Sequence, residues 1–321
     1  MERRPLGETG LEVSRIVLGC GNFGGIGSAP ELFGQGESRE EAFALMDAAF
    51  AAGVNVFDTA ASYGGGRSES WVGAWCAERK VSVQLSTKVF WSVTGDPDDR
   101  GLGHERILRE LDGSLGRLGV ERVDMYLTHE PDEETPIEET LRALDETLRA
   151  GKARAIGASN LDGAALGHAL ETSARLGLAR YGWAQNEYSL LRREAEAEIL
   201  PICEREGLGF TPFSPLAGGW LTGKYRRGEA YPSGSRMTLR PDPYEDLVTD
   251  ETFDGLEAFA AAAADLGVEA ATLAVAWVLG HPQVTAVVVG PRRPEQLATA
   301  LAATELELSP GERDELAGMF A

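Results

Sequence analysis

The chain has 321 residues and a net charge of −21, because 51 acidic side chains outnumber 30 basic ones. So acidic a surface repels nucleic acid and anionic lipid, and we expect neither as a partner; an anionic cofactor would need a local basic patch. Hydrophobic residues at 43% and charged residues at 25% are typical of a globular chain with an ample core. Length alone does not distinguish two small domains from one large α/β barrel.

Cysteine usage and the apolar segments indicate the compartment. Cys20, Cys76 and Cys203 are widely separated and odd in number, which argues against a disulfide framework and suits a reducing cytosol. No CxxC spacing suggests a metal site, and the charged start of the chain lacks the apolar core of a signal peptide. The most apolar expected helix, 270–279, has about half the length that a membrane span requires. We therefore expect a cytoplasmic protein without a metal or a membrane anchor.

The first predicted elements are a hairpin at about 4–13 and a core strand at 14–18, followed by the sequence Gly19-Cys20-Gly21-Asn22-Phe23-Gly24. These six residues fit the dinucleotide fingerprint GxGxxG. That fingerprint opens directly into a helix and is followed by an acidic residue about 20 positions later. Here Pro30 and several glycines delay the helix until about Ser38, and Asp58 is too distant. We reject the Rossmann interpretation and expect these glycines to let the loop approach a ligand closely.

Polar side chains follow three successive predicted strands. Asp58 ends an apolar strand that starts after Gly53, with Tyr63 in the next turn, and the two strands after it end in Lys88 and His129. Each residue alone has an ordinary structural interpretation. Asp58 would accept backbone hydrogen bonds in the turn, and Tyr63 would cover the end of the strand. Lys88 would be a solvated loop residue, and His129 would bond to the backbone. Because parallel strands end at one edge, the recurrence instead indicates a shared site.

The rest of the chain alternates strands and helices, as parallel sheets do. Strands are expected at 153–158, 182–186, 209–212 and 286–289, and helices at 40–52, 68–79, 105–118, 137–150 and 162–176. With the four earlier strands this closes an eight-stranded (β/α)8 barrel, as one domain over 1–321. A long loop at about 214–250 follows the seventh strand and leads to an additional helix at 251–266. Long loops are usually functional, and a disordered surface excursion is the alternative.

These linked motifs resemble the aldo-keto reductase family, in the branch of bacterial and potassium-channel β-subunit-like members. The match includes the Asp58-Thr59-Ala60 to Tyr63-Gly64 stretch, Lys88 and His129, and it extends over nearly the whole chain, to Gly290-Pro291-Arg292-Arg293. The resemblance implies a barrel whose bottom is closed by the hairpin. It also implies hydride transfer from NADPH to an aldehyde, a ketone or a sugar-derived carbonyl.

The four polar residues have separate expected roles in such a reduction. A phenol with a pKa near 10 is a poor acid at neutral pH unless positive charge stabilises its phenolate. We expect Tyr63 to donate the proton, Lys88 to lower the pKa of Tyr63, and Asp58 to keep Lys88 charged and aimed. His129 would orient the carbonyl.

The resemblance also implies which residues bind the cofactor, NADP(H). Those that match the nicotinamide site are Ser159, Asn160 and Gln185, with Phe213 as the stacking aromatic residue, followed by Ser214 and Pro215. Those that match the pyrophosphate loop are Leu216, Gly218, Lys224 and Arg226, and those that match the 2′-phosphate site are Gly290, Arg292 and Gln296. Gly21, Asn22 and Asp58 complete the candidates. Many family members have a Glu-Asn pair where this chain has Thr299-Ala300, so the preference for NADPH or NADH stays open. The first loop, 23–37, is longer than in simple members, so substrate identity is not carried over.

Two other function classes fit parts of this pattern. A barrel glycosidase needs paired carboxylates on opposing strand ends. Glu130 supplies one, but the seventh strand ends in Phe213-Ser214-Pro215, so we disfavour a glycosidase. A cofactor-sensing binding module, like the channel β-subunits that resemble this family, stays open, as does a homo-oligomer.

Overall fold

The computed structural model describes residues 1–320, and eight parallel strands in the order β10-β3-β4-β5-β6-β7-β8-β9 form its main sheet. The strands are β3 Ile16–Gly19, β4 Val56–Asp58, β5 Gln84–Val89, β6 Val123–Thr128, β7 Ala153–Ser159, β8 Trp183–Gln185, β9 Gly209–Phe210 and β10 Val287–Val289. Backbone bonds from Thr285 N to Phe210 O (2.9 Å) and from Val288 N to Pro212 O (2.8 Å) join the last strand segments. The sheet therefore closes, and the predicted (β/α)8 barrel is confirmed.

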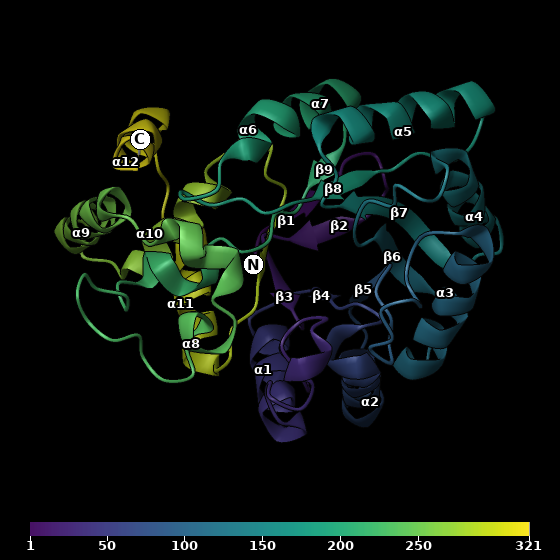
Figure 1. Ribbon diagram of the computed structural model, residues 1–321, viewed down its shortest axis with the longest axis horizontal. Helices are drawn as coiled ribbons and strands as arrows, with labels where there is room; N and C mark the ends of the chain where they lie inside the picture. Colours follow the sequence, from purple (N-terminus) through teal and green to yellow (C-terminus); the bar gives the residue numbers. More distant parts are fainter. Residues whose placement is uncertain (321) are drawn as a thin grey trace.

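Helices surround the strands (Figure 1). They are α1 Arg39–Ala51, α2 Arg67–Arg79, α3 His104–Leu118, α4 Ile137–Arg149, α5 Gly163–Leu176, α6 Glu194–Glu198, α7 Leu200–Glu206, α9 Asp250–Asp265, α10 Ala270–Leu279, α11 Pro294–Ala302 and α12 Pro310–Gly318. Ser38 and Glu41 form a capping box at the start of α1, which fixes that start where the sequence predicts it. Between β3 and α1 there is only a 3₁₀ turn, Pro30–Leu32, so the rejection of a Rossmann helix is confirmed.

The predicted hairpin is present as β1 Arg3–Pro5 and β2 Glu12–Ser14, paired antiparallel. Its apolar residues Leu6, Leu11 and Val13 are at most 2% exposed and pack against inward-facing residues of the barrel strands. Gly7, at φ +51°, lies so close to β9 that a Cβ would come within 2.5 Å of the Gly209 nitrogen. The hairpin thus plugs the bottom of the barrel and leaves the opposite rim for ligands.

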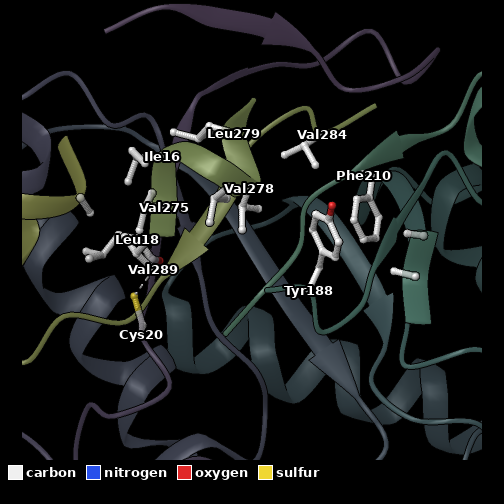
Figure 2. Close-up of a cluster of buried hydrophobic side chains, with 14 of the residues drawn as sticks. Ile16, Leu18, Cys20, Tyr188, Phe210, Val275, Val278, Leu279, Val284 and Val289 are labelled. Atoms are coloured by element: carbon white, nitrogen blue, oxygen red, sulfur yellow. Dashed lines mark hydrogen bonds between the residues drawn. The ribbon is translucent and has the colours of Figure 1, made fainter. Parts of the chain in front are cut away.

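A second apolar layer lies between strands and helices. Figure 2 shows it where β3 and β10 meet α10: Ile16 and Leu18 face Val275, and Tyr188 and Phe210 lie alongside. Every residue of α10 from Thr272 to Leu279 is buried, as expected for a barrel helix. Across residues 1–320 no single helix is both long and apolar enough to cross a membrane.

The strap, defined here as residues 214–249, is not a plain loop. It contains a 3₁₀ turn at Ala217–Thr222, the short helix α8 Arg236–Leu239 and a second 3₁₀ turn at Asp242–Leu247. Trp220 is fully buried, and Met237, Tyr244 and other apolar residues of the strap join the core. The alternative of a disordered excursion is therefore wrong.

Candidate active site

Lys88 and His129 meet at the hydroxyl group of Tyr63, and Asp58 holds Lys88. The Tyr63 hydroxyl lies 3.4 Å from Lys88 Nζ and 3.4 Å from His129 Nε2. Lys88 Nζ in turn donates to Asp58 Oδ2 over 2.5 Å. The sequence therefore placed all four residues on the correct rim, and the fold brings them into direct contact.

Lys88 is held as a charged group inside the protein. It is 2% exposed, and besides Asp58 it donates to the backbone carbonyl of Thr59 over 3.0 Å. Burial works against the charge, but Asp58 and Tyr63 outweigh burial and raise the pKa of Lys88 above its ordinary value. Ser86 Oγ donates to Asp58 Oδ1 over 2.7 Å and so leaves the other carboxylate oxygen for Lys88.

Tyr63 and His129 are both held in their neutral forms. Burial raises the pKa of Tyr63, and the charge of Lys88 offsets only part of that rise. Lys88 does lower the pKa of Tyr63, as predicted, but burial outweighs this effect. The prediction of a Tyr63 pKa below its ordinary value is therefore wrong. Burial, with the charge of Lys88, also holds the pKa of His129 well below its usual range. The site thus offers a protonated phenol beside an ammonium and a neutral imidazole.

The candidate nicotinamide residues lie next to this group. Gln185 Nε2 is 3.4 Å from Asp58 Oδ1, and the Gln185 backbone carbonyl accepts from Ser159 Oγ over 2.7 Å. Asn160, in the left-handed region at φ +59°, donates from its side chain to the His129 carbonyl over 2.9 Å. The three residues are brought together, with the amide oxygens of Gln185 and Asn160 left as acceptors.

The profile of the Aldo/keto reductase family matches residues 15–319 of this chain. The chain belongs to the aldo/keto reductase family. The uncharacterized oxidoreductase YrpG of Bacillus subtilis is 38% identical over 320 residues, which is 96% of this chain and 92% of that protein. A probable voltage-gated potassium channel subunit beta of Oryza sativa is 36% identical, covering 95% and 92% of the two chains. Versiconal hemiacetal acetate reductase of Aspergillus parasiticus is 32% identical, covering 97% and 95%.

These relatives confirm the predicted family and its predicted branch. The chain is accordingly an oxidoreductase of a family that acts on small carbonyl compounds and uses nicotinamide cofactors.

In this aldo/keto reductase, Phe213 and the turn after it leave the end of β9. Phe213 packs against the inward-facing cluster of the barrel. After Pro215, Leu216 is followed by three residues in the left-handed region, Ala217, Gly218 and Gly219. Within this turn the amides of Ala217 and Gly219 donate to the carbonyls of Ser214 and Leu216. The Lys224 side chain folds onto the same turn, since a Cβ on Gly219 would come within 2.2 Å of Lys224 Nζ. Arg226 is exposed and has no ion pair within residues 1–320, so nothing in the fold ties it to the turn.

Arg292, the candidate partner for a 2′-phosphate, is already paired in this reductase. Its Nε donates to Glu37 Oε1 over 2.7 Å, and one terminal nitrogen donates to the Gly234 carbonyl over 3.1 Å. Its backbone nitrogen donates to Gln296 Oε1 over 2.8 Å, so Gln296 fixes this turn. Gly290 lies beside the first loop, where its Cβ position is 3.9 Å from the amide nitrogen of Asn22. Gly21 in the same loop faces the Tyr63 ring, because a Cβ on Gly21 would lie 3.5 Å from that ring.

Sequence reasoning missed two basic residues of the strap, Arg236 and Arg240. Arg236 is half-buried without an ion pair anywhere in the described chain. Burial lowers its pKa, and the charges of Arg240 and Arg292 lower it further. Arg292 reaches the same segment, because one of its terminal nitrogens donates to the Gly234 carbonyl over 3.1 Å, so the three guanidinium groups share one region. We call them the arginine cluster. The sequence does contain a sign of this cluster, because several basic residues occur in this one segment of a chain whose net charge is −21.

The substituted pair Thr299-Ala300 lies on α11. Ala300 is buried in the core, and the Thr299 hydroxyl is 3.2 Å from Glu269 Oε2. Ala300 is therefore not available to a ligand, and the Thr299 hydroxyl is engaged with Glu269.

Proposed function

We propose that this chain reduces aldehydes or ketones to alcohols with NADPH as the reductant. The observation that carries the proposal is the Tyr63 hydroxyl at 3.4 Å from both the Lys88 ammonium and the His129 imidazole. When bound, the cofactor supplies the hydride. The side chains of the site supply the proton, stabilise the phenolate and orient the carbonyl.

In this mechanism Tyr63 gives its proton to the carbonyl oxygen as negative charge develops there. The phenolate that remains is stabilised by Lys88, whose charge is maintained by Asp58. A neutral His129 with its proton on Nε2 donates a second hydrogen bond to the same oxygen and orients the carbonyl. Ser86 and the Thr59 carbonyl keep Asp58 and Lys88 in place.

The residues of the chain fit a phosphorylated dinucleotide. A half-buried cation without a counter-ion is costly, and an anionic ligand removes that cost. Arg236 is such a cation, and beside it the Ser235 hydroxyl is buried without a hydrogen-bond partner. Phe213 offers a flat apolar surface, and Ser159, Asn160 and Gln185 offer polar groups for a carboxamide. We therefore infer that the arginine cluster binds phosphate and favours NADP(H) over NAD(H).

The test is NADPH oxidation with a panel of aldehydes, ketones and hydroxylated carbonyls, together with fluorescence titration of both cofactors. We expect turnover with some of the panel and tighter binding of NADPH than of NADH. Equal affinities would contradict the role given to the arginine cluster.

A second candidate is a cofactor-sensing subunit with little turnover. The observation in its favour is the likeness to proteins named as probable voltage-gated potassium channel subunit beta, in rice and in Arabidopsis thaliana. Tight NADPH binding with no oxidation across the panel, and a homo-oligomer in solution, would support it over the enzyme.

A further inference from the structure

Glu130 stands at the rim of the active site and has no part in the mechanism above. It directly follows His129, and Trp91 Nε1 donates to its Oε1 over 3.4 Å. The two residues are neighbours because Val89 of β5 pairs with Thr128 of β6, and each lies two residues beyond that pair. Both side chains are partly buried. The fold thus holds a carboxylate and an indole together beside the reacting groups.

The Glu130 carboxylate acts on the site electrostatically. Burial raises its pKa, and hydrogen bonds from Trp91 and Asn160 and the more distant charge of Arg240 offset part of that rise. In turn, the negative charge of Glu130 contributes to the raised pKa of Tyr63. Within residues 1–320 Glu130 has no ion-pair partner at 4 Å or less, so its charge is not locally neutralised. It therefore acts on whatever lies next to the Tyr63 hydroxyl.

A carboxylate in this position discriminates between substrates by simple chemistry. It only accepts hydrogen bonds, so it binds hydroxyl groups and repels other carboxylates. The N–H of Trp91 is engaged with Glu130, which leaves the indole ring for apolar contact with C–H groups of a substrate.

We propose that Glu130 is a specificity-determining residue that selects neutral carbonyl substrates bearing a hydroxyl group near the carbonyl and excludes those bearing a carboxylate. This inference rests on the proposed carbonyl reduction. A hydrogen bond to a charged group and a like-charge contact each change relative rates by about tenfold or more.

The experiment compares kcat/KM for glyceraldehyde, propanal and succinic semialdehyde with NADPH. The wild type should prefer glyceraldehyde over propanal and propanal over succinic semialdehyde. In Glu130→Gln the ratio of glyceraldehyde to succinic semialdehyde should fall about tenfold or more, chiefly through faster reduction of the semialdehyde. Glu130→Asp keeps the charge and should still exclude the semialdehyde. Glu133→Gln is the matched control, because Glu133 is exposed in the same loop and loses the same charge.

An unchanged ratio in Glu130→Gln, with normal turnover, would overturn the inference and leave the proposed function standing. If no substrate is turned over, the proposed function fails, and the selectivity of Glu130 is then measured by ligand binding. Erythritol and succinate are then titrated against the complex with NADP⁺. Glu130→Gln should bind succinate more tightly and erythritol more weakly than the wild type, and identical affinities in the two proteins would overturn the inference.

Discussion

Arg292 donates from Nε to the carboxylate of Glu37 over 2.7 Å, although 255 positions separate the two residues in the sequence. The Glu37 side chain is only 1% exposed, and its second oxygen has no hydrogen-bond partner. The Glu37 backbone is tied to the first loop, because its nitrogen donates to the Asn22 carbonyl over 2.9 Å. One ion pair therefore joins the candidate phosphate site to a loop that touches the Tyr63 ring.

Arg292→Ala should have two separable effects. It leaves a buried carboxylate unpaired, so the free energy of unfolding should fall by about 1–3 kcal/mol. It also removes a cation from the phosphate site, so NADPH should bind about tenfold more weakly while NADH is unaffected. Chemical denaturation and fluorescence titration measure the two effects. Adding Glu37→Gln should restore most of the stability without restoring NADPH affinity; joint recovery of both would show that the affinity loss was only structural.

Arg236→Met tests the unpaired cation of the strap. Because Arg236 is half-buried without a counter-ion, its replacement should leave the Tm of the free protein unchanged or higher. NADPH should then raise the Tm less than in the wild type, since ligand stabilisation follows affinity. A large loss of Tm without cofactor would show that Arg236 has a structural partner. Arg142→Met is a control, because Arg142 is exposed on α4 and belongs to neither the strap nor the candidate cofactor residues.

Tyr63→Phe keeps the ring and removes the transferable proton. It should lower kcat by a factor of about 10² to 10⁴ with little change in NADPH affinity. Lys88→Met should do comparable harm, and the double variant should be scarcely worse than either single one, because the two residues act as a unit. Wild-type turnover by Tyr63→Phe would remove Tyr63 from the mechanism.

The rate of reduction should be independent of pH between about 6.5 and about 9. The pKa of Tyr63 is raised above its ordinary value, so the phenol loses its proton only at higher pH. The pKa of His129 lies well below its usual value, so the imidazole gains a proton only at lower pH. The pKa of Lys88 is raised, so its charge persists throughout. A pH profile of kcat/KM that falls within this window would contradict these directions.

The sequence was sufficient for the barrel and for the meeting of Asp58, Tyr63, Lys88 and His129, because strand ends and turns are local signals. It did not reveal α6 and α7, where a second short helix starts at Leu200 with Pro201 in its first turn and no apolar period spans the two. The Arg292–Glu37 pair has no local signal either, since tertiary folding alone brings these residues together. Burial raises the pKa of Tyr63, and the extent of burial cannot be predicted from which charged residues follow the strands.

The pairing of β10 with β3, in which Val288 lies opposite Val17, also bears on biosynthesis. β3 is translated before every other barrel strand and β10 after all of them, so β3 gains its second neighbour only when the other seven strands have been made. Until then one edge of β3 has unpaired backbone groups, which is the kind of edge that pairs with other chains. Closure of this barrel therefore waits until its last strand has left the ribosome, and this edge of β3 needs protection until then.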